Sequence, residues 1–466
     1  MVDGKGNDGV LSLQSKAFHH ICGGVIITLS YLMGSLVYSV QLFRLSIYFG
    51  EGKSQIAMYV LSYLVQAAGL GFYILAYRRS PGIWGSPWVY PAIAPVFLFS
   101  ITGIYLLNQG VGVLACAIAF NAAAALGQGY YFVLLAGAMN KRSRIFVYTA
   151  GYSAASILSS ALIRAGGGAF LFHPSSILLF ALFTVCAAGA ALRCRPPRRN
   201  NEDASPLGCR PPHLGLIVCI VVVMWILHAI GDASVAMQYS ADMSYLFRKG
   251  MYAVGLMAAA LVFSKSRRTG ELLTVLSLLY PLIVPALRED SLMAFLEYSL
   301  LWIFTGILSV YRFTVFAEVA DISRRFLYLA PLGLLLERLT MAACIGASAL
   351  FHPSDLAYMA TTVVLFAALV LLFLKLRYSH RSQSIAPSLK EFAQRYSLTP
   401  REAEVLAKML QSDRSVKELA AQLYISERVL YRHLESIYKK TGAGSRMGLI
   451  LLYYGKNAVL GKEERN

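Results

Sequence analysis

Long runs of apolar residues, separated by short polar stretches, dominate the chain up to about residue 376. A helix needs about 20 mostly apolar residues to cross a bilayer. The ninth of these runs is short and holds Pro281 and Pro285, so it has the weakest pattern. We predict twelve membrane-spanning helices at residues 20–43, 55–77, 88–107, 110–138, 145–166, 175–193, 214–239, 249–265, 271–287, 291–316, 326–350 and 356–376.

From about residue 389 the apolar residues recur at helical spacing instead of in unbroken runs. Thr399, Ser415 and Ser426 are predicted N-caps, and Gly442 is the predicted stop of the third tail helix. Pro400 suits the first helical position, and Glu402 can close a capping box with Thr399. Two short helices joined by a turn of about three residues fit helix-turn-helix geometry. The tail is therefore predicted to form a four-helix domain, with helices near residues 398–410, 415–423, 427–440 and 446–454.

The composition agrees with an all-α membrane protein. Hydrophobic residues make up 57% of the chain, charged residues only 14%, and the mean hydropathy is +0.58, whereas soluble domains carry roughly 25% charged residues. Twelve spans place both termini on one side, where the loops hold twenty Lys and Arg residues against six on the other side. Because cytoplasmic loops are rich in Lys and Arg, both termini are predicted to be cytoplasmic. Much of the net charge of +18 is then loop charge.

The predicted spans form two groups of six. The polar segment Cys194–His213 separates the two groups and is predicted to be a flexible loop. The sequence LFHPSS at Leu171–Ser176 recurs as LFHPSD at Leu350–Asp355, in the last outer loop of each group, which predicts a parallel 6+6 repeat. The predicted domains are a first six-span half at 1–193, a cytoplasmic linker at 194–213, a second half at 214–378 and a soluble domain at 386–466.

This 6+6 plan with a central cytoplasmic loop resembles the major facilitator superfamily. The resemblance covers about 360 residues and rests on architecture. The superfamily's charged loop after the second span is reduced here to YRRSPG at Tyr77–Gly82, which lacks the acidic residue that gates transport. The resemblance implies a polytopic helix bundle with a central cavity, and the missing acidic residue argues against active transport.

The tail carries a more specific resemblance. The blocks LTPREAEVL, KELAAQLYIS and HLESIYKKTG, followed by Ser445-Arg446, are similar to the DNA-binding domain of LuxR/NarL-type regulators. This implies that the third helix enters the major groove of double-stranded DNA and that the fourth helix forms a homodimer on DNA. Carried over by position, the implied DNA-binding residues are Arg428, Val429, Tyr431, Arg432, His433, Glu435 and Lys439.

The tail departs from its family at two of these positions. The usual Thr-Val-Lys run is Val429-Leu430-Tyr431 here, so a hydroxyl and a cation that bind phosphate are lost. Each lost phosphate contact lowers affinity and salt dependence. DNA binding is therefore expected to be weak for a monomer and to depend on dimerisation. Leu430 and Ile437 are expected to face the domain core. A degenerate domain that does not bind DNA is the alternative.

Polar residues within spans are costly and commonly line a cavity or pair with one another. His228 and Asp232 lie one helical turn apart, and Glu337 and Arg338 lie in the middle of the eleventh span. Such residues either pair with other buried groups or form a pocket for a small polar or aromatic metabolite. The candidate ligand-binding residues are Gln41, Asn121, Gln128, His228, Asp232, Glu297, Trp302, Arg312, Glu337 and Arg338.

Enzyme signatures are absent from the sequence: we find no P-loop, GxSxG, HExxH or kinase motif, and we predict no cofactor and no metal site. Two hypotheses remain. In the first, the chain is a membrane-bound one-component transcriptional regulator of the bacterial inner membrane, whose membrane domain senses a small molecule. In the second, it is a facilitator-type transporter with a regulatory, DNA-binding-like tail. The missing gating acid and the intact helix-turn-helix blocks favour the regulator.

Overall fold

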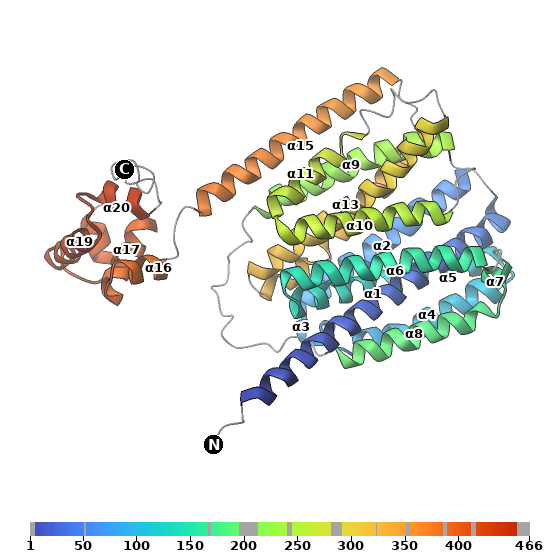
Figure 1. Cartoon of the computed structure of the whole chain (residues 1–466), viewed down its shortest axis with the longest axis horizontal. Coiled ribbons are helices and arrows are strands. Elements are labelled where there is room, and N and C mark those ends of the chain that lie inside the picture. The colour runs from blue at the N-terminus through green and yellow to red at the C-terminus, as the bar shows by residue number, and fades with distance from the viewer. Residues whose placement is uncertain are drawn as a thin grey trace. The chain divides into compact units, whose positions relative to one another are not determined.

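The protein is described by a computed structural model. It covers residues 5–50, 53–165, 169–194, 213–239, 245–280, 291–322, 324–350, 355–384, 389–411 and 416–453. Within these ranges every regular element is a helix (Figure 1). The chain divides into two compact units, Met1–Leu372 and Phe373–Asn466, and the boundary falls inside helix α15. The predicted all-α class, a membrane-type bundle followed by a helical tail domain, is confirmed.

Six long helices form the first half of the bundle. Figure 1 shows them side by side, with α1 packed against α6 and α8, and α5 packed against α2 and α4. Two short helices, α3 and α7, lie in the connections. The long helices are α1 (Lys5–Phe49), α2 (Lys53–Arg79), α4 (Val89–Leu106), α5 (Gly110–Ala138), α6 (Lys141–Ala165) and α8 (Ser176–Arg193), and the short ones are α3 (Pro81–Trp84) and α7 (Ala169–Phe172).

The second half begins after the predicted linker, of which 195–212 lie outside the described residues. The predicted eleventh span starts with a short 3-10 helix and continues as an α-helix after Pro331. Helix α11 covers the ninth predicted span as far as Ser277, and residues 281–290, with both prolines, lie outside the described residues. The elements are α9 (Leu214–Tyr239), α10 (Tyr245–Lys265), α11 (Arg267–Ser277), α13 (Ser291–Ile322), η2 (Arg324–Leu329), α14 (Leu332–Leu350) and α15 (Asp355–Ser384).

Nine helices in the described part of the chain are long and apolar enough to cross a membrane. They correspond to nine of the twelve predicted spans. The other three predictions fall on α9, whose described apolar portion is Leu214–Ile230, on α10 and on α11. The count of twelve therefore remains a prediction, whereas a polytopic bundle is what the structure shows.

Two glycines bring α10 and α13 into close contact. A Cβ atom on Gly255 would lie 1.9 Å from the carbonyl oxygen of Ile303, and one on Gly306 would lie 2.5 Å from the carbonyl oxygen of Tyr252. No larger side chain fits at either position without separating the helices. Small residues at helix crossings are the usual means of close packing in membranes, where the hydrophobic effect does not drive helices together.

The two halves meet along two pairs of helices, α2 against α14 and α6 against α10. A charged contact also crosses between them. Both guanidinium nitrogens Nη1 and Nη2 of Arg144 on α6 donate to the carboxylate of Asp321 on α13, each at 2.6 Å. Arg144 is fully buried, although the sequence prediction counted it among the loop cations.

The tail unit has its own hydrophobic core, centred on Leu406, Leu430 and Ile437. The predicted capping box is confirmed, because the backbone N–H of Thr399 donates to the Glu402 carboxylate at 2.7 Å and the N–H of Glu402 donates back to Thr399 Oγ1 at 3.3 Å. Ser415, a predicted N-cap, lies outside the described residues. A short helix precedes the four that were predicted. The tail helices are α16 (Leu389–Arg395), α17 (Pro400–Gln411), α18 (Val416–Gln422), α19 (Glu427–Thr441) and α20 (Arg446–Tyr453).

Candidate functional sites

Helix α19 is the candidate DNA-recognition helix of the tail. Its N-cap is Ser426, whose hydroxyl accepts from the backbone N–H of Val429 at 3.4 Å, and it ends at Gly442, which has a left-handed φ of 73°. Only a residue without a Cβ adopts that conformation without strain. The predicted N-cap and the predicted stop are thus confirmed. One face of the helix packs into the tail core through Leu430 and Ile437, as expected from the sequence.

The opposite face of α19 is open to solvent. It carries six of the seven residues predicted to bind DNA, and the seventh, His433, is half-buried. Four of them recur at intervals of three and four residues, which aligns their side chains along the helix. Val429 and Tyr431 are 37% and 56% exposed, so the positions that depart from the family pattern belong to the open surface and not to the core. The exposed residues are Arg428, Val429, Tyr431, Arg432, Glu435 and Lys439.

The turn before α19 holds a residue that sequence reasoning did not single out. Tyr424 has a φ of 54°, in the left-handed region, and its side chain is 95% exposed. A bulky residue with positive φ is an outlier that costs free energy relative to glycine or asparagine. Tyr424 therefore adds a second exposed aromatic side chain close in sequence to Tyr431.

Glu402 ties helix α17 to α19. Its carboxylate accepts from Ser436 Oγ at 2.6 Å and from Lys440 Nζ at 2.7 Å, in addition to the capping bond from Thr399. Burial alone would raise the pKa of this carboxyl group, but the hydrogen bonds from Lys440, Ser436 and Thr399 outweigh it and lower the pKa to about 2. The ionised, buried carboxylate of Glu402 thus connects α19 to α17.

In the membrane unit, three of the predicted ligand-binding residues come together. Arg312 of α13 forms an ion pair with Glu337 of α14, and Arg338 Nη1 lies 3.4 Å from the same carboxylate. The side chains of Arg312, Glu337 and Arg338 are only 3%, 12% and 18% exposed. Two guanidinium groups therefore share one carboxylate inside the bundle.

Aromatic residues surround this charged cluster. Arg312 lies 5.7 Å from the ring centre of Trp225, and Arg338 lies 5.1 Å from that of Tyr63, both within cation–π range. Arg312 Nη2 also donates to the Tyr148 hydroxyl at 3.2 Å. Sequence reasoning missed these aromatic residues, because an aromatic side chain within an apolar span has no pattern that separates a site from the core.

His228 joins the cluster through Trp225, since the two ring centres lie 5.2 Å apart. Its Nε2 lies 3.3 Å from Thr305 Oγ1 on α13. The Asp232 side chain, which was predicted to share a face with His228, lies outside the described side chains, as does that of Glu297. Trp302 is half-buried on α13.

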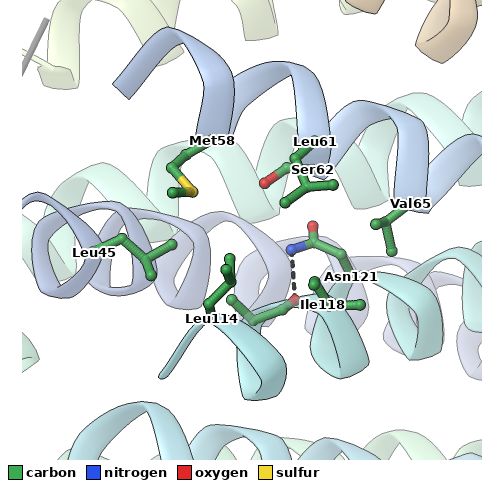
Figure 2. Close-up of a pocket in the computed structure, with 9 residues that line it drawn as sticks. Leu45, Met58, Leu61, Ser62, Val65, Leu114, Ile118 and Asn121 are labelled. Atoms are coloured by element: carbon green, nitrogen blue, oxygen red, sulfur yellow. Dashed lines mark hydrogen bonds between the residues drawn. The ribbon is translucent and has the colours of Figure 1, made fainter. Parts of the chain in front are cut away.

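Gln41 and Asn121 belong to a separate junction in the first half. Asn121 Nδ2 donates to Gln41 Oε1 at 3.1 Å, and Gln66 Nε2 donates to Asn121 Oδ1 at 2.7 Å. The adjoining cavity is lined by Leu45, Met58 and Asn121 among others (Figure 2). It measures about 10 Å³, roughly enough for one water molecule. The ten predicted ligand residues thus do not gather into one pocket: Gln41 and Asn121 lie here, and the Arg312 cluster lies in the second half.

Gln128 lies on α5 and is half-buried, and its Oε1 atom has no hydrogen-bond partner among the described residues. Gln128 therefore remains a candidate ligand-binding residue, but its contacts place it neither at the Gln41–Asn121 junction nor in the Arg312 cluster. The described residues also contain no group of three or more His, Cys, Asp or Glu side chains arranged to hold a metal ion.

A second charged network lies where α6, α11 and α13 approach one another. Glu318 forms ion pairs with Lys141 at 2.5 Å and with Arg267 at 2.8 Å, and Arg267 also pairs with Glu271 at 2.8 Å. Together with Arg144 and Asp321, these groups link the ends of helices from both sequence halves.

Comparison with known proteins identifies the tail. Residues 396–453 match the family model described as bacterial regulatory proteins, luxR family. The spore germination protein GerE of Bacillus subtilis (strain 168) is 39% identical over 57 residues, which are 12% of this chain and 76% of that protein. The matched range contains all of α19 and the candidate DNA-binding residues.

The bundle resembles solved transporters in fold. The fucose:proton symporter of E. coli aligns with a TM-score of 0.52 and 11% identity, over 76% of this chain and 97% of the symporter. A human organic anion transporter aligns with a TM-score of 0.51 and 14% identity, over 77% of this chain and 99% of the transporter. At these identities the likeness concerns the fold alone, and it confirms the major-facilitator-like architecture.

Proposed function

Because the chain belongs to the LuxR family of bacterial regulatory proteins through its C-terminal domain, we propose that it is a membrane-bound one-component regulator that controls promoters in response to a small molecule. The family match and the fold support a DNA-binding regulator with a major-facilitator-like bundle. The main support for DNA binding is the solvent exposure of Arg428, Tyr431 and Arg432 on one helix, α19. These side chains are free to reach phosphates and base edges.

We propose that the bundle is the sensor. Helix α15 (Asp355–Ser384) is the last described element before the tail helices, so we propose that a change in the bundle passes to the tail through this helix. The polar groups buried around Arg312 supply a place for a ligand to act. In this proposal the ligand changes the relative position of the two halves, and the tail changes its dimerisation through α20 or its access to DNA.

We further propose that the protein resides in the bacterial inner membrane with both termini in the cytoplasm, as the distribution of Lys and Arg supports. Only this orientation puts the tail where DNA is. Labelling of single engineered cysteines by a membrane-impermeant reagent in intact cells tests it. A cysteine in the tail should be protected until the cells are opened. Labelling of the tail in intact cells would reverse the orientation.

Genome-wide DNA footprinting of the full chain in its native membrane tests the regulator proposal. We expect discrete occupied promoters that disappear in the double variant Arg428→Ala, Arg432→Ala. The matched control is Lys408→Ala, an exposed cation on α17 that is not among the candidate DNA-binding residues, and it should leave the pattern unchanged. A tail that occupies no promoter under any condition would exclude a regulator.

A second candidate function is transport with a regulatory tail, which the fold of the bundle favours because both aligned structures are named as transporters. The loop at Tyr77–Gly82, which lacks an acidic residue, speaks against it. Uptake of labelled ligand into vesicles that contain the purified protein separates the two. Ligand binding without uptake supports the sensor, whereas accumulation above the outside concentration supports the transporter.

A further inference from the structure

We propose that Arg312 and Arg338 form the recognition site for a small aromatic carboxylate, which binds between the two halves of the bundle. This inference rests on the proposed sensor function and names the chemical class of its ligand. The site contains Glu337, which the two arginines share, and the rings of Trp225 and Tyr63.

The charges in the cluster do not balance. Two guanidinium groups face the single carboxylate of Glu337, so the described side chains carry one positive charge in excess. The Nε atoms of both Arg312 and Arg338 are buried and have no hydrogen-bond partner among the described residues. An unpaired buried charge is costly in a protein and more so within a bilayer. An anionic ligand supplies the missing acceptor and the missing negative charge.

Of the other candidates, Asp232 and Glu297 have side chains that lie outside the described residues, so the charge count concerns the described side chains. His228 makes a ring contact with Trp225, but an imidazole adds no negative charge.

The surroundings select for an aromatic anion. Trp225 and Tyr63 each lie against a guanidinium group, and the Tyr148 ring stacks on Phe313 at 4.4 Å between centres. Flat apolar walls next to guanidinium groups suit a planar ring that carries a carboxylate, since arginine binds carboxylates through two parallel hydrogen bonds. An aliphatic or inorganic anion would pair with the guanidinium groups but would not stack on the rings of Trp225 and Tyr63.

The site draws on both halves. Tyr63 on α2 and Tyr148 on α6 belong to the first half, and Arg312, Arg338 and Trp225 belong to the second. Helices α2 and α14, which carry Tyr63 and Arg338, are also in contact along one of the two seams between the halves. A carboxylate that binds both guanidinium groups would therefore alter the contact between Arg338 and Tyr63, which lies between the two halves. Such a change in the contact between the halves is how ligand binding would produce a signal.

The test measures thermal unfolding of the purified full chain in lipid nanodiscs with four matched probes. Benzoate carries both the ring and the charge, benzamide removes only the charge, cyclohexanecarboxylate removes only the aromaticity, and acetate removes the ring. We expect benzoate to raise the Tm by a few degrees at saturation, cyclohexanecarboxylate to do so more weakly, and benzamide and acetate to have no effect.

A variant series assigns the effect to the site. Arg338→Gln, at a partly exposed side chain, should weaken benzoate binding by about 10-fold or more, and Trp225→Phe should weaken it less. Arg142→Gln, an exposed arginine outside the cluster, is the control and should bind benzoate like the parent. Arg312→Gln is a second variant whose Tm without ligand reports whether the bundle still folds.

Three results would each overturn the inference: no Tm shift with benzoate, an equal shift with benzamide, or an unchanged shift in Arg338→Gln. None of them bears on DNA binding, which is read separately by promoter footprinting of the same preparations. Promoter occupancy without benzoate binding would leave the regulator proposal standing and reject only this ligand class. Benzoate binding without promoter occupancy would reject the regulator and retain the site.

Discussion

Arg144 and Asp321 lie 177 residues apart in the sequence and form a two-pronged ion pair across the halves of the bundle, with both N···O distances at 2.6 Å. Arg144 is fully buried, whereas the Asp321 side chain is 49% exposed. Each half thus supplies one charge, and the buried Arg144 has its counter-charge from the half-exposed Asp321. This contact, with the neighbouring ion pairs of Glu318, fastens α6 to α13.

Asp321→Asn should therefore loosen the contact between the halves. The change leaves the buried Arg144 without its counter-charge, and we expect a loss on the order of 1–3 kcal/mol, reduced from the fully buried case because Asp321 is half in solvent. Thermal unfolding of the full chain in nanodiscs measures the loss. Arg142→Ala, at the exposed position two residues away, is the control. An Asp321→Asn protein as stable as the parent would show that the pair contributes nothing.

Gly255→Ala should destabilise the bundle more than alanine at most other glycines. The new methyl group would overlap the carbonyl oxygen of Ile303, so α10 and α13 must move apart and lose their packing. We expect a lower Tm by several degrees. Gly71→Ala is the control, because a Cβ there meets nothing within 4 Å and alanine also favours the helix. Equal effects of the two substitutions would contradict the close crossing.

The stability of the tail should depend on pH through Glu402. Its pKa falls from 4.5 in the unfolded chain to about 2 in the folded domain, so its stabilisation is complete above pH 4.5 and is lost as the pH falls toward 2. Glu402→Gln should lose roughly 1–3 kcal/mol at neutral pH and flatten the profile between pH 4.5 and 2. Denaturant unfolding of residues 386–466, followed by circular dichroism, measures both effects.

Glu404→Gln is the matched control for this experiment. The Glu404 side chain is 50% exposed and forms an ion pair with Arg401 on the surface of α17, so its removal should change stability little. If both variants kept the acid-sensitive profile of the parent, the linkage would have to be assigned to another carboxyl group in the tail.

Tyr431→Lys should strengthen DNA binding and make it more sensitive to salt. The exposed tyrosine stands where the family carries a lysine, and a cation there adds about one phosphate contact, so the slope of log affinity against log salt should steepen by about 1. Gel-shift titrations on a selected promoter at several salt concentrations measure the slope. Tyr431→Phe is the control and should leave it unchanged. An unaltered slope in Tyr431→Lys would mean that position 431 does not face phosphate.

The sequence by itself determined the local structure and the broad class of this protein. Apolar runs predicted the membrane bundle, and the caps Thr399, Ser426 and Gly442 predicted where tail helices begin and end, because capping depends on a few neighbouring residues. The block order of the tail predicted a LuxR-type domain, and the family match confirmed it. The resemblance to this family also implied the burial of Leu430 and Ile437, which the structure shows.

Only the tertiary structure decided which distant residues meet. The sequence proposed Gln41, Asn121, Arg312 and Glu337 as parts of one site, yet the fold places the two amides in one junction and the two charged residues in another. It also paired Arg144 with Asp321, which loop counting could not do. Polar residues in an apolar span carry no periodic signal that names their partner, because a partner is set by how whole helices cross. That crossing depends on packing details such as Gly255, which only the folded bundle reveals.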